Sequence, residues 1–193
     1  MQEELPGPAV LVQRTADPSE RQIQRVVAEL VLDSHRVVGE LHYGGGHRRL
    51  VDILNAVDEA FVVLHNGVVD HFHFHRAEGE PRRFQVMHVR LHAILLAIPR
   101  AGVPPQGDRF EVVVKVPVPA TIILPGVEVT GKLYLPPDAD PAQVRLLSGK
   151  HFIPLTDTTV APVEDRSQAR PEPLLVVNLA RVLVYAPGGL TGA

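Results

Sequence analysis

Three histidines alternate with two phenylalanines in the segment Asp70-His71-Phe72-His73-Phe74-His75. Successive side chains of a β-strand point to opposite faces, so the histidines would share one face and the phenylalanines the other. Two or three imidazoles at this spacing suit zinc, copper or nickel. A further histidine lies just before the Asn66-Gly67 turn signal and could join them. The candidate metal ligands are His65, His71, His73 and His75.

A basic loop is the second candidate site. It follows the glycines Gly44-Gly45-Gly46 and precedes a short apolar helical segment. The start of a helix attracts anions, so this loop could contact a phosphate or a nucleic-acid backbone. The glycines lack the spacing of a phosphate-binding loop and no Gly-Lys-Ser/Thr follows, so a solvent-exposed loop is the favoured interpretation. The candidate anion contacts are His47, Arg48 and Arg49.

The composition restricts the classes of function. The chain has no cysteine, which excludes thiolate catalysis, disulfides and cysteine-bearing zinc sites. Its net charge of −3, from 19 basic and 22 acidic residues, disfavours nucleic-acid binding, which normally needs a clustered basic field. No signal-peptide pattern, membrane-length apolar run or Ser/His/Asp constellation is evident. We therefore expect a cytoplasmic, non-enzymatic protein without a membrane association.

The elements that would position these residues are short strands. Eighteen prolines and fifteen glycines mark many turns, and the strand-like segment around Gly39 recurs around Gly131 with the same apolar-polar rhythm. A glycine inside a strand often marks a bulge or a bend. The residues that define or accompany the repeat are Gly39, Leu41, Asp52, Asn55, Phe61, Gly131, Leu133, Phe152 and Asn178.

This repeat predicts an all-β chain built from two tandem, internally duplicated small antiparallel β-barrel modules, each with one short helical turn. Barrel closure would remove most exposed sheet edges. The expected boundaries are 1–25 for an N-terminal lead with a helical turn near 18–24, 26–100 for the first module, 101–109 for a linker, 110–188 for the second module and 189–193 for a tail.

The repeat also bears on the histidine strand. The second half has Pro162, Val163 and Glu164 near the corresponding place, so the module does not need the histidines to fold. The favoured interpretation is an ordinary hairpin, with its phenylalanines facing the core and its histidines facing water. Short metal-site motifs often match a sequence by chance. We therefore expect no cofactor, with zinc or another transition metal as the alternative.

Two sets of residues resemble known families. A strand with Gly39-Glu40-Leu41, the later Asp52-Ile53-Leu54-Asn55, and closing strands joined at Arg90 and Asn178 resemble the Sm-like small barrels. The turn that contains Asp52 and Asn55, followed by Phe61, resembles an uncharacterised bacterial domain that recurs in tandem. Both resemblances imply small barrels, and the first implies nucleic-acid binding as one function.

Three functions follow from these observations. The first is a non-enzymatic protein-interaction or assembly module that binds a protein partner or further copies of itself as a homo-oligomer. It is preferred because it fits the duplication, the absence of a convergent catalytic set and the valine-rich strands. A single module of this size is marginally stable, and packing of the two modules or oligomerisation would remedy this. The alternatives are an Sm-like nucleic-acid-binding protein and a metal-binding protein or metalloenzyme that uses the histidine strand.

Overall fold

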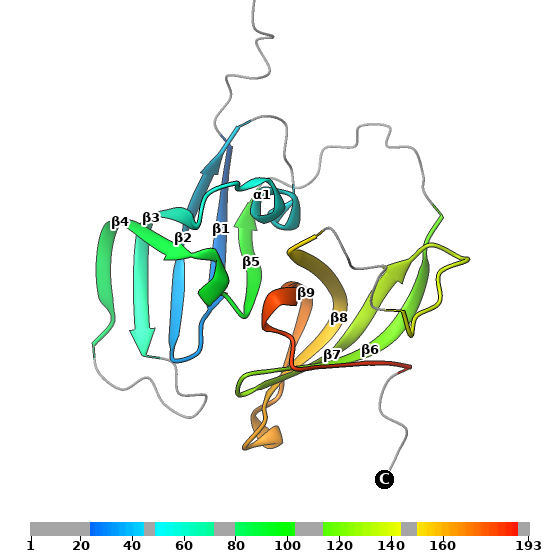
Figure 1. The fold of residues 1–193 in the computed structure, drawn as a ribbon. Coiled ribbons are helices and arrows are strands. Elements are labelled where there is room, and N and C mark those ends of the chain that lie inside the picture. The colour runs from blue at the N-terminus through cyan, green and yellow to red at the C-terminus, as the bar shows by residue number, and fades with distance from the viewer. Residues whose placement is uncertain (1–23, 45–48, 72–79, 103–113, 144–149, 189–193) are drawn as a thin grey trace, which may run out of the picture.

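The computed structural model describes residues 24–44, 49–71, 80–102, 114–143 and 150–188. These residues form a single ten-stranded antiparallel sheet and one α-helix (Figure 1). The prediction of an all-β protein is therefore confirmed. Residues 18–23 of the expected helical turn, residues 103–109 of the expected linker and the tail at 189–193 lie outside the described residues. Gln24 begins a strand, and Ala101 and Gly102 end one.

The strands divide into two halves of five in chain order. The first half contains β1 (Gln24–Val31), β2 (His35–Tyr43), α1 (Leu50–Ala56), β3 (Phe61–His71), β4 (Arg82–Arg90), the 3₁₀ helix η2 (Leu91–Ala93) and β5 (Leu96–Gly102). The second half contains β6 (Val116–Leu124), β7 (Val127–Leu135), β8 (Phe152–Pro162), the 3₁₀ helix η4 (Arg166–Gln168), β9 (Arg170–Asn178), the 3₁₀ helix η5 (Leu179–Arg181) and β10 (Val184–Pro187).

The two halves join edge to edge. The strand order is β10-β6-β7-β8-β9-β5-β1-β2-β3-β4, so β9 of the second half pairs with β5 of the first in the middle of the sheet. Strands β4 and β10 are the two outer edges. The ribbon shows the two strongly curved halves side by side, with α1 near the ends of β1 and β5 (Figure 1).

The prediction of closed barrels is wrong. Closure of the first half would require β4 to pair with β5, and closure of the second would require β9 to pair with β10. Instead β5 and β9 pair with each other, because each finds in the other half a partner for its open backbone groups. Whether the halves are copies of one module stays a prediction.

Each half contributes side chains to the core of the other. The first core gathers apolar residues of β1–β5 and α1, and it includes Phe152 and Val176 from the second half. The second core gathers residues of β6–β9, and it includes Leu95, Leu96 and Ile98 from the first half. Both cores are therefore completed only when β5 and β9 are paired.

Gly39 and Gly131 both lie where the regular pairing of their strand with the next is interrupted. The register of β2 against β3 shifts between Val38 and Glu40, and that of β7 against β8 shifts between Thr130 and Lys132. A Cβ atom at Gly131 would lie 2.6 Å from Thr158 Cγ2 and 3.1 Å from the Thr156 carbonyl oxygen. The glycine therefore permits a close approach of two backbones, as interruptions of this kind often require.

Replacing Gly131 with alanine should lower the free energy of unfolding by about 1–3 kcal/mol, because the new methyl group overpacks against Thr158. Thr158→Ser removes the contacted Cγ2 atom and keeps the hydroxyl that donates to the Glu172 carbonyl at 2.7 Å. In urea unfolding, the double variant should be more stable than the sum of the two single changes predicts. Strictly additive effects would contradict the proposed contact.

Candidate functional site

The structure describes only part of the predicted metal site. His71 is the last residue of β3, and its backbone pairs with His35, whereas His73 and His75 lie outside the described residues. His65 precedes His71 by roughly 20 Å along the same strand. Its ring stacks on that of His42 with centroids 4.2 Å apart and 9° between the planes. No group of three or more histidine or acidic residues suited to a metal occurs in the described ranges.

The basic loop is described only at its end. His47 and Arg48 lie outside the described residues, and Arg49 immediately precedes α1. The Arg49 guanidinium donates from Nε to Asp52 Oδ2 at 2.6 Å and from Nη2 to Asp52 Oδ1 at 2.8 Å. This hydrogen-bonded pair raises the pKa of Arg49, despite an opposing effect of burial. Asp52 therefore has a defined partner at the start of the helix.

Asn55 connects α1 to the second half. Its side-chain nitrogen donates to the Phe152 carbonyl at 2.9 Å, and its side-chain oxygen accepts from the Phe152 N–H at 2.9 Å and the His151 N–H at 3.1 Å. The amide thus pairs with both backbone groups of one residue, much as a neighbouring strand would. Asn55 therefore links α1 of the first half to the start of β8 in the second half.

The backbone pairing between the halves is short and is reinforced by Asn178. Leu96 pairs with Val177 and Ala97 with Val176, and the Asn178 N–H donates to the Leu95 carbonyl at 3.0 Å. The buried Asn178 side chain donates to the carbonyls of Leu91 at 3.1 Å and Ile94 at 2.9 Å. We call this region, with β5, β9 and the contacts between them, the junction.

A cluster of four charged residues crosses the junction. Glu29 on β1 accepts from Arg100 on β5 at 2.6 Å and from Arg170 on β9 at 2.8 Å. Arg100 also donates to Glu172 on β9 at 2.8 Å. Burial acts to raise the pKa of Glu29, but the hydrogen bonds from Arg170 and Arg100 prevail and hold it below its usual value of 4.5. The cluster therefore joins three strands by compensated charge.

The outer edges repeat the geometry of the junction, but no strand of the described residues pairs with them. Asn178 directly precedes η5 and Arg90 directly precedes η2, so Val176 on β9 and His88 on β4 occupy the same position before their 3₁₀ helices. Val176 is buried at the junction, whereas His88 is exposed. The position that β9 buries at the junction is therefore exposed on the edge of β4.

The edge of β10 has the same relation to β5. The Leu95 N–H donates to the Val31 carbonyl at 2.8 Å after η2, and the Leu183 N–H donates to the Ile123 carbonyl at 2.8 Å after η5. Leu95 is 1% exposed at the junction, whereas Leu183 is 65% exposed at the outer edge. The same position is therefore buried in the core at the junction, where it is Leu95, and exposed to solvent at the outer edge, where it is Leu183.

Two further pairs show the same contrast. Phe152 and Phe61 begin β8 and β3 and pair with the residue before each 3₁₀ helix, but Phe152 is 1% exposed and Phe61 37%. Leu96 and Val184 are the first residues of β5 and β10, and their exposures are 0% and 47%. Sequence reasoning missed both edges, because it placed Leu183 and Val184 inside a closed second module at 110–188, where they would not lie on an open edge.

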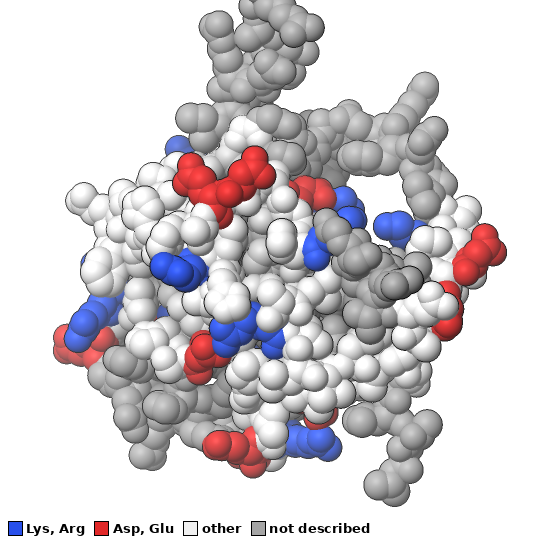
Figure 2. All heavy atoms as spheres, viewed as in Figure 1, with Lys and Arg blue, Asp and Glu red and all other residues white. Residues whose placement is uncertain are grey.

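Charge is mixed on the surface in view. Figure 2 shows basic and acidic side chains interspersed among uncharged ones, and the described residues on this face form no large area of one sign.

None of the described helices has the length and apolar character needed to cross a membrane. No protein-family model, curated protein or solved structure matches the chain, so its geometry alone carries the functional argument.

Replacing Glu29 with glutamine should lower the free energy of unfolding by about 1–3 kcal/mol, because Arg100 and Arg170 lose the charge-assisted hydrogen bonds to this buried carboxylate and keep only Glu172. The depressed pKa of Glu29 stabilises the folded protein above the usual carboxylate value, and this stability is lost as the pH falls through the folded pKa. The free energy of unfolding of the unmodified protein should therefore fall more steeply between about pH 6 and about pH 3 than that of the variant.

The exposed residue Glu59 provides the control, because Glu59→Gln makes the same chemical change on the surface of the first half. Its free energy of unfolding should stay within about 0.5 kcal/mol of the unmodified protein. Equal pH profiles for the protein and for Glu29→Gln would show that the cluster does not stabilise the junction.

Proposed function

We propose that this protein is a non-enzymatic assembly module that self-associates head to tail, with the β4 edge of one copy paired to the β10 edge of the next. The observation that supports it is the junction, where the chain already joins two five-stranded halves in this way. The outer edges present exposed residues at the positions that the junction buries. The second copy would therefore repeat a pairing that the chain makes internally.

The junction also supplies the register. Leu96 pairs with Val177 and Ala97 with Val176. Counting from the 3₁₀ helices, the same pairing between copies sets Val184 opposite Val89 and Tyr185 opposite His88. The Arg90 N–H then takes the place of the Asn178 N–H, which donates to the Leu95 carbonyl. Both edges then gain backbone hydrogen bonds that no other strand in the described part of the chain provides.

Burial of apolar side chains would provide most of the free energy of association. Leu183, Val184 and Phe61 are partly exposed, and full burial of a side chain of this size contributes about 1.5–3 kcal/mol. Strand addition then contributes direction and register. The interface between copies lacks the charge cluster of the junction, because Thr121 and Gly188 stand where Glu29 and Arg100 stand in the first half. The interface between copies is therefore less stable than the junction within the chain.

The two surfaces differ, so the association is directional. A contact between unlike surfaces adds copies in one sense and leads to a closed ring or an open filament rather than to a two-fold dimer. In this proposal the halves are copies of one module. Their common strand order, the strand glycines Gly39 and Gly131 and the two 3₁₀ helices η2 and η5 support that interpretation. Nucleic-acid binding and metal binding gain no comparable support from the described residues.

Two substitutions on exposed residues test the edges separately. His88→Glu places a carboxylate on the β4 edge and Leu183→Glu places one on the β10 edge, and neither disturbs a buried side chain. In sedimentation velocity the unmodified protein should form oligomers whose proportion rises with concentration. Each variant alone should sediment as a monomer of 21.1 kDa, because a charge would have to be buried without a partner.

Mixing the two variants gives the sharpest result. Each keeps one intact edge, so the mixture should form a species of twice 21.1 kDa and nothing larger. Val163→Glu, a similar change at an exposed position away from both edges, should leave the oligomers unchanged. A monomeric unmodified protein at high concentration, or a mixture that stays monomeric, would contradict head-to-tail pairing.

A further inference from the structure

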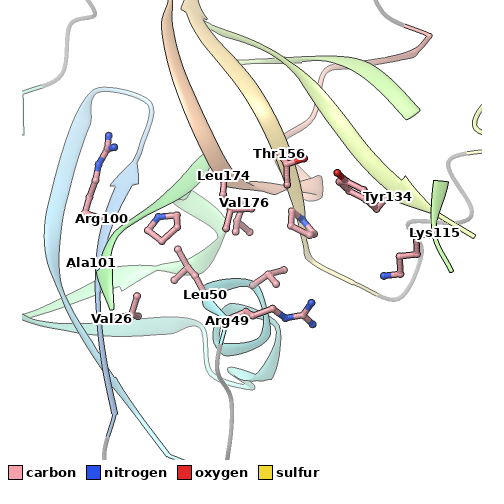
Figure 3. Close-up of a pocket in the computed structure, with 13 residues that line it drawn as sticks. Val26, Arg49, Leu50, Arg100, Ala101, Lys115, Tyr134, Thr156, Leu174 and Val176 are labelled. Atoms are coloured by element: carbon pink, nitrogen blue, oxygen red, sulfur yellow. The ribbon is translucent and has the colours of Figure 1, made fainter. Parts of the chain in front are cut away.

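A cavity of about 560 Å³ lies beside the junction within a single chain. Its walls come from α1, β1 and β5 of the first half and from β7, β8 and β9 of the second (Figure 3). This volume is typical of small-molecule sites, which are mainly apolar with a few placed polar groups. The cavity does not depend on the outer edges, so its role is separate from self-association.

One side of the cavity is apolar. Val26, Leu50, Leu174 and Val176 lie together on this side, with the backbone of β5 behind them (Figure 3). Arg100 also borders the cavity, but its guanidinium is engaged by Glu29 and Glu172. This wall could accept a hydrocarbon chain and offers it no polar partner.

The polar groups lie on the other side. The Tyr134 hydroxyl points toward Thr156, and the Arg49 and Lys115 side chains point toward one another (Figure 3). Thr156 Oγ1 is buried and has no hydrogen-bond partner in the part of the chain that the structure describes. Neighbouring atoms cover this hydroxyl oxygen, so the groups that face an occupant of the cavity are the Tyr134 hydroxyl and the two cationic side chains.

The charge of this polar side is positive. None of the described residues that line the cavity is acidic, and Arg49 carries its own counterion in Asp52. Among the described residues, Lys115 has no ion pair. One uncompensated ammonium beside a compensated guanidinium favours a single negative charge on the occupant. The division into an apolar and a cationic side calls for a ligand divided in the same way.

We infer that this cavity binds an amphipathic carboxylate of the fatty-acid type. Its hydrocarbon chain lies against Leu50, Leu174 and Val176, and its carboxylate accepts hydrogen bonds from Lys115 and Arg49. An anion matches this side of the cavity, because Arg49 and Lys115 are cations that can only donate hydrogen bonds. An apolar peptide segment would fill the wall but would offer no negative charge to Lys115 and Arg49, so it is the poorer match.

Isothermal titration of the full chain with sodium dodecanoate, kept below its micelle concentration, tests the assignment. One dodecanoate per chain should bind. Dodecyltrimethylammonium, which has the same hydrocarbon chain and the opposite charge, should bind at least about tenfold more weakly. Equal binding of the two amphiphiles would overturn the carboxylate assignment and leave only an apolar cavity, open to a peptide segment.

Two lysine variants identify the charge that is responsible. Lys115→Gln should weaken dodecanoate binding about tenfold, as expected for the loss of a charge-assisted hydrogen bond. Lys150→Gln makes the same change at an exposed lysine that does not line the cavity, and it should bind as the unmodified protein does. Leu174→Asp, which places a carboxylate on the apolar wall at a partly exposed position, should abolish binding.

Circular dichroism shows whether each variant keeps its sheet. Because Lys115 is exposed, its variant should fold, and the comparison of the two lysines remains decisive if Leu174→Asp does not. Absence of binding to the unmodified protein, or equal affinities for the two lysine variants, would overturn the proposal. Neither result would affect the pairing of outer edges, which is measured by sedimentation.

Discussion

The pairing of β5 with β9 is the contact on which the rest of the molecule depends. Only two residue pairs form the backbone pairing between these strands. The same contact nevertheless completes both cores, and the charge cluster and the Asn178 hydrogen bonds lie across it. Strand pairing alone would add little stability. The side chains of each half that enter the other core make this joint part of the hydrophobic interior rather than a surface contact.

The all-β class followed from the sequence because local patterns determine it. Alternating apolar residues, glycines and prolines indicate short strands and turns, and they placed strands around Gly39 and Gly131. The open sheet could not be predicted in this way. Periodicity shows which residues of a strand face inward, but the choice of partner for β5 depends on Leu96 meeting Val177, far apart in the chain.

The candidate sites show the same division between local and distant information. Histidine spacing drew attention to a segment that the structure describes only at His71, and Arg49 was noted as part of a basic loop. Nothing in the sequence connects Arg49 with Lys115, Tyr134 or Thr156, since their neighbourhood arises from the packing of the two halves. Glu29 was a better local signal, because a carboxylate within an apolar strand requires a partner when it is buried.

The crossed cores have a consequence for synthesis on the ribosome. The first half emerges with β5 unpaired and with its core open at the places that Phe152 and Val176 later fill. Its own sequence cannot complete it, and β6, β7 and β8 must all be made before β9 can pair with β5. The first half therefore reaches its stable form only after β9 of the second half has been made.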